Sequence, residues 1–340
     1  MLPGVTLPVS LAGLLGALRP CFTAPSFRTF CGLAAGLAGQ VRRRTVVGML
    51  LGADLARAWP HDRAHYFFAR ARWEASELGL AAARLVAEAF PGRTVHVVAD
   101  AAYHGPALKH LPACLTWTTR LPADAALDAL APPRLPGERG RPCLKGLRLG
   151  TPAELAATAT WTPVTVRIYG RSHHTDLAAI TCLWYGCLRT CTVKVILARN
   201  HASVMALVTT DLATPAAALT GRYAARWSTG RAIADARNIL GAGEARNRTR
   251  RAVERTVPFA LIVSTLVVTW YARHGHPRHT LTARRHDQPW YTTKAEPAFE
   301  DMLTQLRRTM IAARISAGSG AHPTPEQTQQ VLAAWHAAAA

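Results

Sequence analysis

The chain lacks the cysteine pairs of a zinc site or a disulfide framework, and it lacks an apolar run long enough to span a membrane. Spanning a bilayer takes roughly 20 apolar residues, whereas the run Val257–Ala272 is shorter and lies between two arginines. A signal peptide has a basic segment before its apolar stretch, but no basic segment precedes the apolar stretch Leu7–Leu18. We therefore expect a buried core helix at 257–272 and no membrane segment. The cysteines stand singly, without CxxC spacing, and are expected to be reduced thiols, at positions 21, 31, 114, 143, 182, 187 and 191.

The chain also has few acidic residues. It carries 20 acidic and 40 basic side chains, a net charge of +20. Arginine outnumbers lysine, and its guanidinium suits bidentate phosphate contacts. A surplus of this size favours polyanion binding through counterion release. GC-rich coding would also enrich Arg, together with Ala, Gly and Pro, so composition by itself leaves this alternative open.

Two histidines have the spacing of a zinc site but lack the other ligands. His61 and His65 have the i, i+4 spacing of a zinc pair, but no third ligand or catalytic Glu follows them. We expect them to be surface or core histidines.

Hydrophobic periodicity predicts a mixed α/β chain. Segments with helical spacing, broken by prolines, are 1–73, 74–90, 214–272 and 297–315. Segments rich in Val, Thr and Ile predict strands at 94–99, 115–119, 164–168, 192–197 and 205–210. A helix is expected to begin near Pro106, charged turns are expected around 284–287, and the end at 337–340 is expected to fray.

One helical motif places four residues on a single stripe. At about 100° per residue, Arg226, Gly230 and Arg237 fall within about 60° of Tyr223. The motif therefore predicts that these four positions of one helix face one site. An ordinary amphipathic helix is the alternative.

The motif resembles the Tyr-Arg-Glu-Lys signature of DDE-type bacterial insertion-sequence transposases, whose catalytic core is RNase H-like. The segments Leu240–Arg248 and Ala252–Phe259 resemble the same family, and the similarity covers residues 90–275. It implies that Tyr223 and Arg226 support the catalytic site and terminal phosphates, and that Arg237 replaces a DNA-contacting Lys.

Asp100 ends the strand predicted at 94–99. The sequence from Asp100 to Pro106 resembles the family's second-aspartate motif, in which a strand delivers an Asp to a metal site. Taken alone, Asp100 is better explained as a turn or helix N-cap residue. The resemblance implies that Asp100 is a metal ligand and that the family's cofactor is Mg²⁺ or Mn²⁺.

The rest of the catalytic carboxylate set is missing. Two-metal strand transfer needs three carboxylates, but Gly230 occupies the expected Glu position. Asp235 lies about 140° from that stripe. In the family a strand that carries the first aspartate precedes the second-aspartate strand, but no strand ending in Asp stands between Trp73 and Val95. The resemblance therefore implies an internal deletion of the first three strands of the core sheet, and a rearranged N-terminus is the alternative. The ancestral chemistry, and with it metal binding, is therefore in doubt.

The predicted fold is a truncated RNase H-like α/β core with a helical N-terminal region and a β-rich insertion. Its regions are a helical N-terminal region for DNA recognition at 1–73, the core at 74–120 and 213–280, a basic loop and β-rich insertion at 121–212, and a C-terminal helical tail at 281–340. Basic segments predict DNA contacts by Arg141, Lys145, Arg246, Arg248, Arg250 and Arg251. For the basic loop at 121–150, a disordered linker is the alternative.

These patterns favour a transposase-family DNA-binding protein whose strand cleavage and transfer is defective. An active transposase with relocated carboxylates and a non-functional remnant are the alternatives. The expected partners are DNA, at element ends and targets, and a homo-oligomer or mixed assembly with intact relatives. The expected location is the bacterial cytoplasm, at the nucleoid.

Overall fold

The computed structural model describes most of the chain. The described residues are 4–41, 44–92, 94–102, 114–134, 136–137, 139–168, 171–200, 203–224, 226–318 and 324–338. The fold is mixed α/β with one mixed sheet.

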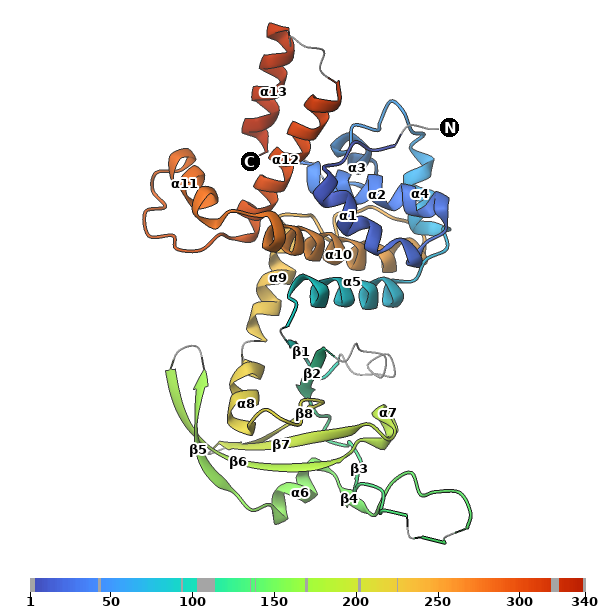
Figure 1. Cartoon of the computed structure of the whole chain (residues 1–340), viewed down its shortest axis with the longest axis vertical. Helices are drawn as coiled ribbons and strands as arrows, with labels where there is room; N and C mark the ends of the chain where they lie inside the picture. Colours follow the sequence, from blue (N-terminus) through green and yellow to red (C-terminus); the bar gives the residue numbers. More distant parts are fainter. Residues whose placement is uncertain are drawn as a thin grey trace. The chain divides into compact units, whose positions relative to one another are not determined.

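The chain forms two compact units (Figure 1). Unit 1 contains Met1–Pro91 and Arg231–Ala340, and unit 2 contains Gly92–Gly230. Helix α9 (Trp227–Asn238) belongs partly to each. The units begin and end at other residues than the predicted regions, because the helix predicted at 74–90 lies with the N- and C-terminal helices and not with the sheet.

Unit 1 is helical, and α10 (Arg250–His274) packs against most of its other helices. The N-terminal helices are α1 (Val9–Ala17), η1 (Arg19–Cys21), α2 (Ala24–Gly39), α3 (Val46–Gly52), α4 (Asp62–Ala69) and α5 (Ala75–Ala89). The C-terminal helices are α11 (Pro277–Asp287), α12 (Phe299–Gly318) and α13 (Pro325–Ala337). One apolar cluster joins them, in which Phe259 of α10 meets Phe30, Phe67 and Phe68 edge to face.

Helix α10 is the one described helix whose length and apolar composition would suffice to cross a membrane. More than half of its apolar window is buried inside the protein, at 56%. Its residues Phe259, Val263, Leu266 and Trp270 belong to the core of unit 1. The predicted core helix at 257–272 is therefore confirmed.

Helices α2 and α3 approach each other through glycines. A Cβ on Gly36 would overlap the carbonyl oxygen of Met49, and a Cβ on Gly39 would lie 2.5 Å from the carbonyl oxygen of Gly52. A Cβ on Gly52 would lie 2.8 Å from the amide nitrogen of Gln40. The two backbones touch directly, so any larger side chain at these positions would push the helices apart.

Two buried arginines donate mainly to carbonyl groups, although Arg255 also lies 3.5 Å from a Glu74 carboxylate oxygen. Arg255 of α10 donates to the carbonyls of Phe68, Ala71 and Trp73, and its guanidinium lies 4.4 Å from the centre of the Trp73 ring. Arg307 of α12 donates to carbonyls of Ala38, Gln40 and Ala338. These contacts tie loops at helix ends to the long helices. Ala338 is buried, so the predicted fraying is wrong at this residue, while 339–340 lie outside the described residues.

Unit 2 is built on an eight-stranded sheet in the order β1-β2-β8-β7-β6-β3-β4, with β5 paired to β6. The strands are β1 (Val95–Ala99), β2 (Leu115–Arg120), β3 (Leu127–Asp128), β4 (Arg148–Gly150), β5 (Thr162–Ile168), β6 (Arg171–Leu183), β7 (Thr192–Asn200) and β8 (Ser203–Thr209). Its helices are α6 (Pro152–Thr158), α7 (Tyr185–Leu188) and α8 (Ala216–Ala224).

Only β1 and β2 are parallel among the described strands, and β1 ends the strand order. Alternation along β7 gives each sheet face its own core: Val193 and Val195 contribute to one cluster, and Ile196 and Ala198 to the other. Helix α8 covers the second face with Leu219 and Tyr223.

The predicted strands agree with β1, β2, β5, β7 and β8, and the helices predicted at 1–73, 74–90 and 297–315 are present. In the described part of the chain no strand precedes β1, as predicted. The charged turns predicted at 284–287 are wrong, since these residues end α11. The helix predicted near Pro106 lies outside the described residues.

Candidate functional site

Asp100 directly follows β1 and contacts Arg226, which stands two residues after the end of α8. The Arg226 guanidinium donates to Asp100 Oδ2 at 3.1 Å, and the backbone N–H of Ala101 donates to Oδ1 at 2.8 Å. The side chain of Asp100 is half exposed, at 52%. Both carboxylate oxygens therefore already accept hydrogen bonds, one of them from a cation.

The ring of Tyr223 packs against this ion pair. Tyr223 is a residue of α8 and is buried in the core that this helix covers, and the Arg226 guanidinium lies 5.4 Å from its ring centre. Burial raises the pKa of the Tyr223 phenol, although the Arg226 charge opposes this. The phenol is therefore neutral at physiological pH, and its ring holds Arg226 against Asp100. Three of the predicted site residues, Asp100, Tyr223 and Arg226, are thus together.

The prediction of one continuous helical stripe is wrong. Helix α8 ends at Ala224, Arg226 lies in a turn, and α9 begins at Trp227. The N–H of Arg226 bonds the carbonyl of Tyr223, the short i to i+3 contact of a tight turn. Helical spacing is a local preference, and the pairing of Arg226 with Asp100 is a tertiary contact that overrides it.

Gly230 and Arg237 both lie on α9, seven residues apart, and so share one side of that helix. Gly230 is exposed, and a Cβ there would meet no atom within 4 Å. Arg237 is exposed in the last turn. The position expected to carry a glutamate therefore has space for one but supplies no ligand.

The described donor atoms do not fit the two-ion centre that the transposase resemblance implies. Within the described ranges, no three His, Cys, Asp or Glu side chains gather into a group that could hold a metal. Asp100 offers a single carboxylate, and Arg226 already supplies its countercharge. We therefore derive no reaction step through a metal at this site.

A polar network that the sequence did not indicate joins β1 and α8 near Asp100 and Tyr223. Asp211, buried after β8, accepts from Arg222 Nη1 at 3.1 Å and from the Thr214 hydroxyl at 2.7 Å. His96 Nδ1 on β1 lies 3.2 Å from Arg222 Nη1 and 2.5 Å from the Thr116 hydroxyl. His96 lies on β1, and Asp100 directly follows the end of that strand. The alternation of the strand was the only signal available for this network.

The network shifts two pKa values. Burial alone would raise the pKa of Asp211, but hydrogen bonds from Thr214, with His96 and Arg222, outweigh it and hold that pKa below its ordinary value. Partial burial lowers the pKa of His96, the Arg222 charge lowers it further, and Asp211 opposes both. The folded protein therefore favours an Asp211 anion beside a neutral His96.

We expect the stability of the protein to fall as the pH drops below about 6.5, the ordinary His pKa. The unfolded chain then protonates His96 more readily than the folded chain does, so the contribution is lost as the pH falls through the lowered folded pKa. His96→Asn should flatten this part of the profile of melting temperature against pH. His65→Asn, on an exposed residue of α4, is the control. An NMR titration in which His96 ionises above the exposed histidines would contradict the prediction.

The predicted DNA contacts differ in how free they are. Arg141, Arg246 and Arg248 are exposed, and within the described residues no carboxylate pairs with them. Lys145 instead pairs with the buried Asp128 at 3.0 Å, which gives it a structural role. Arg250 pairs with Glu254 at 2.7 Å, and Arg251 with Glu74 at 3.1 Å.

No protein-family model matches the chain, and no curated protein matches its sequence. A functional proposal therefore rests on the residues and contacts described above.

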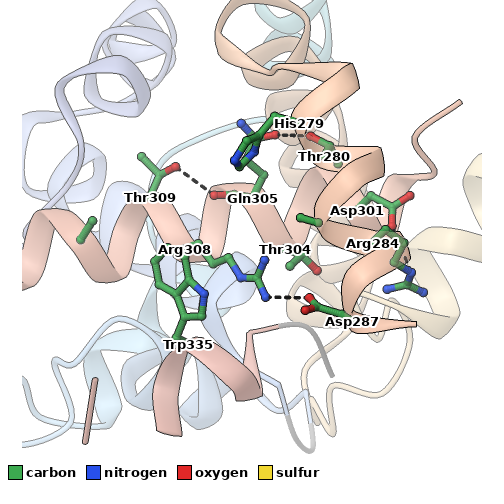
Figure 2. Close-up of a pocket in the computed structure, with 12 residues that line it drawn as sticks. His279, Thr280, Arg284, Asp287, Asp301, Thr304, Gln305, Arg308, Thr309 and Trp335 are labelled. Atoms are coloured by element: carbon green, nitrogen blue, oxygen red, sulfur yellow. Dashed lines mark hydrogen bonds and ion pairs between the residues drawn. The ribbon is translucent and has the colours of Figure 1, made fainter. Parts of the chain in front are cut away.

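A separate cavity of about 280 Å³ lies among α11, α12 and α13 of unit 1. Figure 2 shows Arg308 beside Trp335 with its guanidinium on Asp287; that hydrogen bond is 3.1 Å long. Arg284 pairs with Glu300 and Asp301, and Lys294 also pairs with Asp301. The charges around this cavity compensate one another and leave no surplus for a charged ligand. The ion pairs hold α11 against α12, and Arg308 also stacks on Trp335 of α13.

Proposed function

We propose that this chain is a DNA-binding protein of transposase descent that has lost metal-dependent strand transfer. In this proposal the sheet of unit 2 is a truncated RNase H-like core with a β-rich insertion. The observation that carries the proposal is the group of exposed arginines at the start of α10. Arg246 and Arg248 lack a carboxylate partner among the described residues, and Arg250 and Arg251 follow them on the helix.

The start of α10 has further features that suit a phosphate. Thr249 precedes the helix without a side-chain capping bond, and the first turn carries no acidic residue. Helix N-termini present free N–H groups and partial positive charge to anions. Four arginines beside such an end support contacts to the DNA backbone, and the net charge of +20 supports attraction at longer range.

Asp100 and Gly230 support the proposal that strand transfer has been lost. The Asp100 carboxylate holds an arginine, and Gly230 offers no ligand on α9. An edge strand β1 that directly follows α5 agrees with deletion of the first strands of the ancestral core. An active enzyme with relocated carboxylates and a folded remnant without function are the rival hypotheses. The expected partners are DNA and further copies or intact relatives of the chain, and the expected site of action is the nucleoid in the cytoplasm.

A salt series on the purified chain tests this proposal. Fluorescence anisotropy with a labelled duplex should give binding at low salt, with log affinity falling linearly against log salt. Each neutralised phosphate adds about 0.9 to that slope, so half a dozen contacts reduce the affinity on the order of a thousandfold between 50 and 200 mM salt. Salt-independent affinity, or no binding by well-folded protein at low salt, rejects DNA binding and favours the remnant hypothesis.

We expect no DNA cleavage with Mg²⁺ or Mn²⁺, and Gly230→Glu should not restore it. A Cβ at position 230 would meet no atom within 4 Å, so the glutamate fits there. Replacing the glycine stabilises the helix by up to about 1 kcal/mol. The first aspartate would still be absent. A nicking assay on a supercoiled plasmid, with EDTA as the control, measures the outcome.

Two results would contradict this expectation. Cleavage by the wild-type chain that Asp100→Ala abolishes would show that other carboxylates complete a site. Activity gained by Gly230→Glu would show that no essential strand has been deleted.

A further inference from the structure

Strands β5 and β6 form a long two-stranded ribbon, and among the described strands none other than β6 pairs with β5 (Figure 1). The two strands pair in antiparallel register from Thr162↔Leu177 to Ile168↔Arg171. Seven residues of β5 extend the ribbon over roughly 20 Å at about 3.3 Å per residue.

The two faces of the ribbon have different partners. Val166 is buried, and Val164 and Ile168 pack with it against the core under α8. The opposite face presents four exposed side chains that point to the same side of the sheet, which we call the ribbon face: Thr165, Arg167, Ser172 and His174. The ribbon face therefore looks to solvent while its other face is fixed to the protein.

Helix α8 holds the ribbon closely. A Cβ on Gly221 would lie 2.7 Å from the carbonyl oxygen of Arg167. The ring of Tyr223, on the same helix, packs against the Arg226 guanidinium, which pairs with Asp100. The ribbon face and the Asp100 site are therefore parts of one unit.

The ribbon face carries hydrogen-bonding groups and a positive charge. Arg167 has no carboxylate partner within the described residues. Thr165 Oγ1 and His174 Nδ1 lie 3.2 Å apart, which leaves the Nε2 side of the imidazole for another partner. Asp176 is the only acidic residue between Glu154 and Asp211, and Arg199 neutralises it at 2.9 Å.

A hollow lies beside the ribbon face. It has a volume of about 560 Å³, and its polar lining includes Thr165, His174, Asp176 and Arg199. The Arg199 guanidinium also lies 4.5 Å from the centre of the Trp161 ring, which fixes its position. The surface thus combines a guanidinium, hydroxyls and an imidazole in a concave polar setting without a surplus of negative charge.

We propose that the ribbon face lies in the major groove of duplex DNA. The strands of a ribbon lie about 4.8 Å apart; the major groove, about 12 Å wide, admits a two-stranded ribbon, whereas the minor groove is only about 6 Å wide. Arginine is suited to guanine O6 and N7, and serine and threonine hydroxyls contact bases or phosphates. This inference rests on the proposed DNA-binding function and assigns it a second surface, in unit 2.

Two ribbon variants and one matched control test the inference. Arg167→Ala removes the charge, Ser172→Glu places a carboxylate on the ribbon face, and Arg278→Ala removes an exposed arginine from α11. Binding to one duplex is measured by anisotropy, with circular dichroism to verify folding. Displacement is then measured with methyl green, a major-groove ligand, and with distamycin, a minor-groove ligand.

We expect Arg167→Ala to weaken binding at least about fivefold, as loss of a base contact does, and Ser172→Glu to weaken it further. Arg278→Ala should bind like the wild type, and methyl green but not distamycin should compete. Duplex RNA should compete poorly, because its major groove is deep and narrow.

The outcomes separate the two hypotheses. Wild-type binding that neither ribbon variant alters, or that distamycin or duplex RNA competes, overturns the ribbon inference and leaves DNA binding through α10. If Ser172→Glu does not fold, Arg167→Ala still decides between these results. A wild-type chain that is folded and does not bind DNA overturns the proposed function and the ribbon inference together.

Discussion

Replacing Arg246, Arg248, Arg250 and Arg251 together by alanine should remove most of the salt dependence of DNA binding. If each arginine neutralises one phosphate, the slope of log affinity against log salt falls by about 3.6, at about 0.9 per contact. The loss should be similar on unrelated sequences, since phosphate contacts position a protein without specifying sequence. Anisotropy titrations from 50 to 200 mM salt measure the change.

The ion pairs divide this effect between two matched double variants. Arg250 and Arg251 already pair with Glu254 and Glu74, whereas Arg246 and Arg248 have no carboxylate partner among the described residues. We therefore expect the Arg246→Ala/Arg248→Ala protein to lose more slope than the Arg250→Ala/Arg251→Ala protein. An unchanged slope in the quadruple variant would show that DNA is bound elsewhere on the chain.

The second large effect is on stability. Gly36→Ala should destabilise unit 1 by about 3 kcal/mol or more, at or above the upper end of the usual cost of overpacking. The new Cβ would overlap the Met49 carbonyl oxygen and lie 3.0 Å from Met49 Cα. These are backbone atoms, which cannot rotate away as a flexible side chain would. For a unit of this size we expect the melting temperature to fall by about 10 °C.

Gly79→Ala is the matched control for this prediction. Gly79 lies inside α5, and a Cβ there would meet nothing within 4 Å. Alanine should therefore stabilise the helix by up to about 1 kcal/mol. Thermal unfolding followed by circular dichroism compares the two variants. Equal melting temperatures for both would mean that α2 and α3 are not in backbone contact.

Secondary structure was predictable where the pattern was local. Val95–Ala99 and Thr192–Asn200 are rich in Val and Ile and form strands, and Pro91-Gly92 follows the end of α5. The thirteen-residue strand β6 was missed. Its first half, Arg171 to Asp176, is polar and resembles a loop, but β5 pairs with it along its length, and β7 pairs with the strand from Asp176 onward. Pairing across the sheet therefore decided its conformation.

The site shows the same limit. Spacing predicted that Tyr223 and Arg226 belong together, and the strand before Asp100 was recognisable. The predicted stripe was wrong because Arg226 lies in a turn, where it pairs with Asp100, 126 residues away in the chain. Lys145, predicted to contact DNA from its basic loop, pairs with Asp128, whose burial no local pattern indicates; its contact with DNA stays a prediction.

The sequence alone determined the surplus of positive charge, the absence of a glutamate at position 230 and the strands with a local Val-, Thr- and Ile-rich pattern, because these depend on composition and on neighbours along the chain. The tertiary structure decided which charges are free and which are paired. It also decided that Asp100 holds an arginine, and that one face of the β5–β6 ribbon looks to solvent. Ion pairs and exposure depend on residues brought together from distant positions, so folding alone determines them.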